Sequence, residues 1–157
     1  REAFDRLGVI VDELDVSTAT ANEISDKLMR NDYIYVSGGN TFFLLQELRK
    51  SGADKVIEEQ VAAGKLYIGE SAGSIIVSPD IEYAKDMDDC AAAPGLVDFS
   101  ALNLVNFYPG PHRGNFPFEE AVEKIIDVYS GRMELMPISN SEVIMVDGNK
   151  IEVGSAG

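Results

Sequence analysis

The sequence lacks the features of a secreted or membrane-spanning protein. It contains one cysteine, Cys90, which cannot form an internal disulfide and suits a reducing compartment. It has no apolar run approaching about 18 residues and no signal-peptide pattern, so neither a transmembrane helix nor secretion is expected. The predicted location is therefore the cytoplasm.

Basic residues and metal-binding residues are also scarce. The chain has 13 Lys and Arg residues against 27 Asp and Glu residues, for a formal net charge of -14. Such a surface repels phosphate backbones and anionic lipid, so we expect neither nucleic acid nor a membrane as a partner. With one histidine and one cysteine, no cluster of metal-ligand spacing exists, and no metal or other cofactor is predicted.

The remaining composition is that of one globular domain. The 157 residues are 45% hydrophobic, which is enough to bury a core, and no repeat or linker divides residues 1–157. Apolar periodicity predicts helices at residues 19–29, 41–49, 54–63 and 118–129, strands at 9–11, 33–36, 66–68 and 102–107, and a terminal hairpin at 143–146 and 151–153. This alternation predicts an α/β fold, with a mostly parallel, doubly wound sheet covered by helices on both faces.

A Gly-x-Ser-x-Gly pattern lies where such folds place their sites, at the carboxyl end of a strand. Residues 69–73 read Gly-Glu-Ser-Ala-Gly between the strand at 66–68 and a short helix. This context is typical of a nucleophile elbow, in which the turn lifts the Ser71 hydroxyl above the sheet. The N–H of Ala72 would then point toward a developing oxyanion. The alternative is a tight turn with a capping serine.

His112 is the only histidine, so if Ser71 has an imidazole base within the chain, that base must be His112. It lies in a turn-rich loop that Pro109 and Pro111 stiffen, and a stiff loop helps to position a base. A surface-loop histidine without a role is the alternative. Cys90 lies in an acidic stretch of the sequence and is disfavoured as the nucleophile.

The carboxylate that would orient His112 is open at this point. Asp86, Asp88 and Asp89 lie between the serine and the histidine in the sequence. Glu70 directly precedes the serine. A catalytic triad needs one such group to hold the imidazole and stabilise its charged form. A solvated acidic loop is the alternative for the three aspartates.

A second glycine turn, Gly38-Gly39-Asn40-Thr41, follows the strand at 33–36. It lacks the lysine of a P-loop and the third glycine of a dinucleotide-binding fingerprint, which disfavours phosphate binding. We expect it to form a wall of the site, with a glycine N–H as a second oxyanion donor. Asn40 or Thr41 can at the same time cap the helix that follows.

Together these segments resemble the peptidase E family of serine peptidases, the α-aspartyl dipeptidases, which also includes cyanophycinase-like enzymes. The resemblance rests on residues 36–45, 66–73, 101–104 and 111–112, in the family's order, and extends over most of the chain. Family members have about two further β/α units before the position of Leu7. We therefore expect this chain to lack them, as a fragment or with a partner filling the exposed sheet edge.

The resemblance implies a fold like that of the class I glutamine amidotransferases, with a serine in place of the usual cysteine. It implies Ser71 as the nucleophile and His112 as the base. The family also has a candidate acid in a later segment, where this sequence has Asn140. That departure favours Asp86 as the acid of the triad.

The resemblance also implies a substrate-binding turn and an oxyanion hole. Gly39 and Ala72 would supply the oxyanion N–H groups, and Gly38 and Asn40 would line the substrate. The aspartyl dipeptidases place an arginine after the histidine loop to bind an acidic side chain. Only Arg113 lies near that position here, so a strict preference for an N-terminal aspartate is not expected.

Three functions fit these residues. The first is a serine peptidase acting on short peptides, as a dipeptidase or in the manner of an aminopeptidase. A small-molecule esterase of the α/β-hydrolase type keeps the order Ser, Asp, His but usually separates the serine from the histidine by more of the sheet. A binding module without catalysis is the third. The expected partners are a short peptide substrate and, as an open alternative, further copies of the chain.

Overall fold

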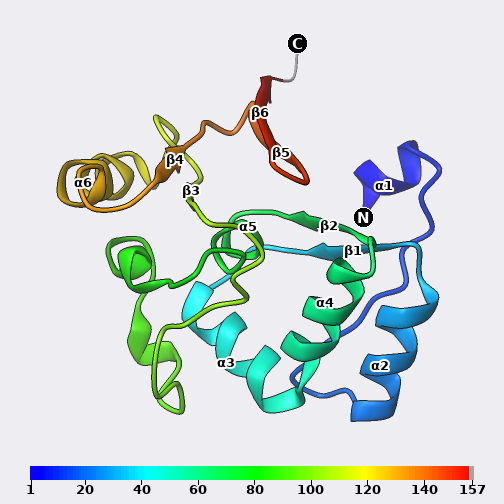
Figure 1. Ribbon diagram of the computed structural model, residues 1–157. Coiled ribbons are helices and arrows are strands. Elements are labelled where there is room, and N and C mark those ends of the chain that lie inside the picture. The colour runs from blue at the N-terminus through cyan, green and yellow to red at the C-terminus, as the bar shows by residue number, and fades with distance from the viewer. Residues whose placement is uncertain (156–157) are drawn as a thin grey trace. The chain divides into compact units, whose positions relative to one another are not determined.

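The computed structural model describes residues 1–155 and has the mixed α/β composition that the sequence predicts (Figure 1). Backbone contacts group the chain into two compact units. The first unit comprises Arg1–Ile34 with Glu47–Tyr67, and the second comprises Tyr35–Gln46 with the described residues from Ile68 onward. A single domain over residues 1–157 stays a prediction. No helix within residues 1–155 has the length and apolar character that crossing a bilayer requires.

Two helices pack side by side to form the first unit (Figure 1). α2 (Ala21–Arg30) and α4 (Ala53–Ala62) each bury an isoleucine, Ile24 or Ile57, that is 1% exposed. Burial of such a side chain contributes about 1.5–3 kcal/mol. The unit also contains α1 (Glu2–Arg6), the end of α3 (Thr41–Ser51) and the first halves of β1 (Tyr33–Val36) and β2 (Leu66–Gly69).

Lys65 holds the C-terminal end of α2. Its Nζ donates hydrogen bonds to the carbonyl oxygens of Leu28 and Met29, at 2.6 and 2.8 Å. The last carbonyls of a helix have no intrahelical partner, and the helix dipole favours a cation beside them. Since Lys65 directly precedes β2, these bonds also fix where β2 begins relative to α2.

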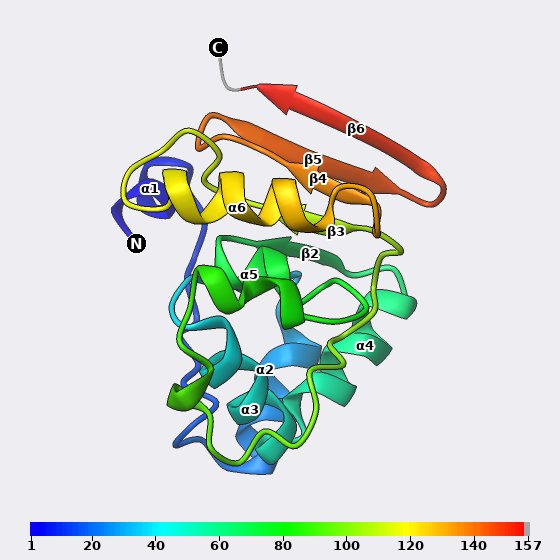
Figure 2. The ribbon, with the colours of Figure 1, turned by 90° about the vertical axis from the view of Figure 1, so that its left-hand side faces the viewer.

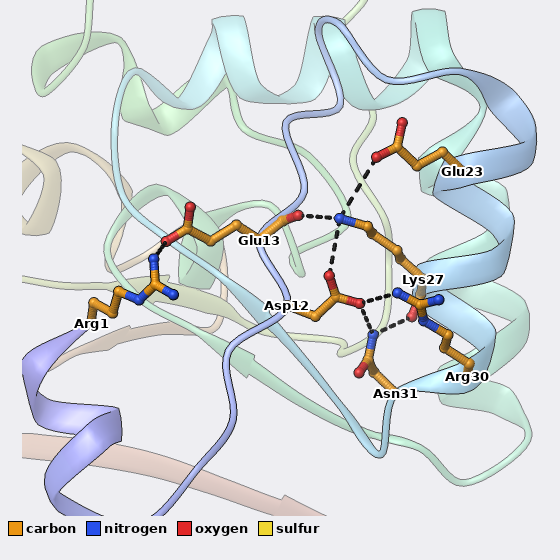
Figure 3. Close-up of polar contacts among 7 residues, drawn as sticks. All are labelled: Arg1, Asp12, Glu13, Glu23, Lys27, Arg30 and Asn31. Carbon is orange, nitrogen blue, oxygen red and sulfur yellow. Dashed lines mark hydrogen bonds and ion pairs between the residues drawn. The ribbon is translucent and has the colours of Figure 1, made fainter.

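Asp12 ties the irregular segment before α2 to that helix (Figure 3). Its carboxylate accepts from Arg30 Nη2 at 2.7 Å and from Asn31 Nδ2 at 2.9 Å, and it lies 3.0 Å from Lys27 Nζ. Lys27 also donates to the backbone oxygen of Glu13. These donors, with Arg30 the largest contributor, hold the pKa of Asp12 well below its ordinary value of 3.8.

The second unit contains the remaining helices and strands. They are α5 (Ala72–Ile75), the 3-10 helices η1 (Glu82–Asp86) and η2 (Cys90–Ala92), α6 (Glu119–Tyr129), and the strands β3 (Tyr108–Gly110), β4 (Leu135–Pro137), β5 (Glu142–Asp147) and β6 (Lys150–Ser155). α6 packs on η1 and β4. Figure 2 shows α6 from the side, with β4 close to it. Val122 and Ile125 on this helix are 1% exposed. Tyr83 in η1 is also buried and donates its O–H to the Pro109 carbonyl of β3 at 2.6 Å.

The described strands pair in three two-stranded sheets. β1 pairs with β2, β3 is parallel to β4, and β5 is antiparallel to β6. The terminal hairpin is therefore confirmed, with Gly148 and Asn149 in its turn and Asp147 aligned with Lys150. The mixed α/β class is confirmed as well. One continuous, doubly wound parallel sheet stays a prediction.

Two expected strands are wrong. Residues 9–11 form no strand, and Ile10 is 94% exposed, because this segment is held by the side-chain bonds of Asp12 and by a turn. Residues 102–107 are also irregular, because Asn103 has a φ of 51° that interrupts an extended run. The strand begins instead at Tyr108.

Replacing Asp12 by Asn is expected to destabilise the protein near neutral pH. Because the folded state lowers the pKa of this carboxyl, its contribution is present above a pH of about 4 and is lost as the pH falls further. Urea unfolding of both proteins at several pH values, followed by circular dichroism, measures the difference. We expect the stability gap between wild type and Asp12→Asn to narrow in acid, and Asp32→Asn, at an exposed aspartate, to show no such trend. A constant gap would contradict this role.

Candidate active site

The turn between β2 and α5 is so crowded that two of its positions admit only glycine. A Cβ on Gly69 would lie 2.3 Å from the carbonyl oxygen of Gly73, and a Cβ on Gly73 would lie 2.1 Å from the carbonyl oxygen of Val36. Both distances are far inside van der Waals contact. Ser71, between the two glycines, has φ 52° and ψ -113°, which a residue with a side chain rarely adopts. Such strain is often found at functional sites.

The hydroxyl of Ser71 meets the imidazole of His112. The Ser71 Oγ lies 2.8 Å from His112 Nε2. His112 follows β3 and also has a positive φ, 70°. Its ring stacks on Phe118, with centroids 4.9 Å apart and planes 25° from parallel. The structure therefore brings together the serine and the histidine that the sequence analysis paired.

Asn140 contacts the other ring nitrogen of the histidine. The Asn140 Oδ1 lies 2.7 Å from His112 Nδ1. An amide oxygen can only accept, so Nδ1 carries the proton and Nε2 presents its lone pair to the Ser71 O–H. The three residues form a chain of hydrogen bonds in the order Ser71, His112, Asn140. Asn140 lies at the position of the family's candidate acid, but because an amide is not a carboxylate it was not predicted to orient the histidine.

Parallel pairing of β3 with β4 brings the histidine and the asparagine together. The pairing continues beyond the strands, where the Arg113 N–H donates to the Ile138 carbonyl at 2.9 Å. His112 follows β3 and Asn140 follows β4, so the two side chains leave adjacent loops on the same end of the ladder. Parallel strands present their carboxyl ends at one edge, which is where sites of α/β proteins lie.

Asp86, the acid that the sequence favoured, is paired with a lysine in the structure. Its Oδ1 lies 2.5 Å from the Nζ of Lys124 on α6. The reason is local, because η1 packs on α6 and directs the carboxylate to that helix. The partner of the His112 imidazole is Asn140 instead.

The two other aspartates of the acidic run have local partners. Asp88 Oδ2 accepts from the N–H and the hydroxyl of Thr41, at 2.9 and 2.6 Å. Asp89 Oδ1 accepts from the Ala91 N–H at 2.9 Å and caps η2. A carboxylate at the start of a helix is favoured by the helix dipole, so Asp88 stabilises α3.

The Gly38-Gly39-Asn40-Thr41 turn lies directly against the serine. A Cβ on Gly38 would be 3.2 Å from the Cβ of Ser71. Asn40 Oδ1 accepts from the N–H groups of Phe42 and Phe43, both at 3.0 Å, and so caps α3. The capping role expected for this turn is therefore confirmed.

Gly39 and Ala72 stay the predicted oxyanion donors. Ala72 follows the serine and is the first residue of α5, where N–H groups have no partner within the helix. Gly39 has a φ of 137°, in the region that favours glycine. Ala72 directly follows Ser71, and Gly39 directly follows Gly38, which lies against Ser71.

Glu70, also considered as an acid for the histidine, bonds to a tyrosine. The O–H of Tyr35, on β1, donates to Glu70 Oε2. Burial and this carboxylate, in that order, raise the pKa of Tyr35 to about 12. The phenol therefore stays protonated at neutral pH and ties β1 to the residue before the nucleophile.

These contacts can support nucleophilic attack by a hydroxyl on a carbonyl carbon. A half-buried serine in a strained turn is within hydrogen-bond distance of a base, and an oriented group holds that base. The reaction class that uses such a chain is acyl transfer, with hydrolysis of amides or esters as its commonest outcome.

Comparison with known proteins agrees with this chemistry. Residues 1–154 match the model of Peptidase family S51. An uncharacterized peptidase of Pasteurella multocida is 56% identical over 147 residues, which are 94% of this chain and 71% of that protein. One of Listeria monocytogenes is 52% identical over 151 residues, 96% of this chain and 74% of the relative. The crystal structure of a candidate peptidase E from Listeria monocytogenes superposes with a TM-score of 0.95 at 49% identity, covering 99% of this chain and 75% of that one.

Adding a methyl group at Gly73 is expected to destabilise the elbow. In Gly73→Ala the new Cβ meets the Val36 carbonyl, and overpacking of this kind costs roughly 1–3 kcal/mol. Gly131→Ala is the matched control, since a Cβ there meets nothing within 4 Å. Thermal and urea unfolding of the two variants measure the effect. Equal stability of both would show that the close approach at Gly73 is not needed.

Proposed function

The chain belongs to peptidase family S51, and on that premise we propose that it is a serine peptidase that hydrolyses short peptides. The observation that carries the proposal is the 2.8 Å contact between the Ser71 hydroxyl and the His112 imidazole. The strained backbone of Ser71 supports it, because strain of this kind is often found where a nucleophile is presented to substrate. The proposed substrate is a dipeptide or another short peptide.

In the proposed mechanism the Ser71 oxygen attacks the carbonyl carbon of the scissile peptide bond. His112 Nε2 takes the hydroxyl proton as the bond forms and later gives it to the leaving amine. The N–H groups of Gly39 and Ala72 hold the negative oxygen of the tetrahedral intermediate. Water, activated by the same imidazole, then releases the acyl group from the serine.

Asn140 takes the third position of this triad in our proposal. By accepting from Nδ1–H it fixes the tautomer in which Nε2 is the base, as the asparagine of the papain-like Cys-His-Asn proteases does. The nearby carboxylate of Glu142 accepts from the Ser139 N–H at 2.7 Å, and this bond is the main cause that lowers its pKa. Glu142 is therefore held in its own turn, and the group facing the imidazole is neutral.

We propose that the site accepts a broad range of amino acids in its substrates. Arg113, the nearest candidate for an acidic substrate side chain, lies 3.5 Å from Glu123 and is therefore already paired. Phe116 in the same loop is 88% exposed and offers an apolar contact instead. We accordingly propose no strict requirement for an N-terminal aspartate.

Two further parts of the proposal concern the fold and its location. We propose that the paired strands belong to a doubly wound sheet of the kind found in class I glutamine amidotransferases, for which the parallel β3–β4 pair is the support. We propose the cytoplasm as the compartment, because the chain has a single cysteine.

Replacing Ser71 by Ala is expected to abolish peptide hydrolysis. Without the attacking oxygen, kcat should fall by at least about 1,000-fold, while the fold is retained. The assay is a panel of dipeptides and aminoacyl p-nitroanilides with acidic and neutral first residues. Turnover of esters alone would indicate an esterase. A folded wild-type protein that hydrolyses neither the peptide substrates nor esters would indicate a binding module.

Asn140 and Asp86 are expected to respond differently to substitution. Asn140→Leu removes the acceptor of the Nδ1 proton and should lower kcat on the order of 100-fold, because the base is misplaced. Asn140→Asp puts a negative charge beside the ring, which favours the protonated imidazole and should move the acid limb of the pH–rate profile to higher pH.

Asp86→Asn is the matched control, since Asp86 pairs with Lys124 on α6. Its kcat and pH profile should equal those of wild type. A large loss in Asp86→Asn, with little in Asn140→Leu, would reverse the assignment.

A further inference from the structure

The His112–Asn140 contact is made between two loops that extend beyond the short strands β3 and β4. Each strand has three residues, and the interacting side chains lie beyond the strand ends. Stacking on Phe118 fixes the plane of the imidazole but leaves the ring able to rotate within that plane. The direction of Nδ1, and with it that of Nε2, therefore depends on where the Asn140 backbone is held.

Asn115 bonds to the backbone of both loops. Its N–H donates to the His112 carbonyl at 3.0 Å, which closes the turn carrying the imidazole. Its side-chain Oδ1 accepts from the Asn140 N–H at 2.9 Å, which holds the second loop. Its carbonyl accepts from the Phe118 N–H at 3.0 Å, which holds the residue under the ring. Asn115 thus contacts the backbone of the base, His112, and of the two residues that orient its ring, Asn140 and Phe118.

We propose that Asn115 is a positioning residue for the general base, acting through Asn140. The inference rests on the proposed peptidase function for its catalytic consequence, although the loop contact itself does not. Among these contacts the side-chain bond to the Asn140 N–H is the one that depends on residue type, since any residue but proline supplies the two backbone bonds. The position therefore requires a side chain of the right length that ends in an acceptor oxygen.

This requirement gives a matched series of variants. Asn115→Leu keeps the size of the side chain and removes the acceptor, and Asn115→Asp keeps the acceptor. Asn115→Ala also removes it and replaces Asn115→Leu should that variant fail to fold. Asn106→Leu is the control, because Asn106 is an exposed asparagine in the irregular segment before β3.

The first readout is independent of activity. The chain has one histidine, so the ring proton and nitrogen signals in a nitrogen-15 NMR spectrum belong to His112 alone. In wild type we expect a protected Nδ1–H signal. Asn115→Leu should lose it through exchange with water, and Asn115→Asp and Asn106→Leu should keep it. A protected signal in Asn115→Leu would overturn the proposal.

The second readout is kinetic. Asn115→Leu should lower kcat by about 10–100-fold with little change in KM, because the base is misplaced while the substrate contacts remain. Asn115→Asp should recover most of that loss, and Asn106→Leu should show none. Wild-type kcat in a folded Asn115→Leu protein would overturn the proposal. Absence of any turnover in wild type would instead count against the peptidase function, and the NMR comparison would still decide the role of Asn115.

Discussion

The carbonyl oxygen of Val36 occupies the space that a side chain on Gly73 would need, and the geometry around the serine depends on this close approach. The same carbonyl accepts from the Glu70 N–H at 3.0 Å, so the end of β1 is bonded to the residue that precedes the nucleophile. The glycine turn that continues from β1 is consequently laid against Ser71. The nucleophile and the wall beside it are therefore joined by contacts between backbone atoms.

The histidine comes from a second piece of backbone, the loops beyond the parallel pair β3 and β4. The contact between Ser71 and His112 joins the two pieces, and a neutral amide orients the imidazole from behind. A carboxylate in that place would stabilise the protonated ring. In the proposed mechanism the asparagine supplies direction alone, and stabilisation of the transition state falls more heavily on the backbone N–H groups of the oxyanion hole.

Local patterns predicted the parts of this site that depend on neighbouring residues. The glycines around Ser71 and the cap at Asn40 could be predicted because crowding and capping act within a few positions. The partner of the histidine could not be predicted in this way. Asp86 is 26 residues from His112 in the sequence and Asn140 is 28, so distance along the chain does not choose between them. Tertiary packing determines which side chain contacts the histidine, since Asp86 forms an ion pair with Lys124 instead. β3 was missed because Pro109 and Gly110 are typical of a turn.

The strained backbone of Ser71 affects the balance between the stability of the protein and its catalytic activity. A residue with a Cβ at φ 52° and ψ -113° adopts a conformation that costs about 1–3 kcal/mol, and glycine would adopt it with less strain. The residue with the least backbone strain at this position is therefore glycine, which has no hydroxyl. The serine is therefore retained at a cost in stability. A substitution to glycine at this position would give a more stable protein that lacks the nucleophile.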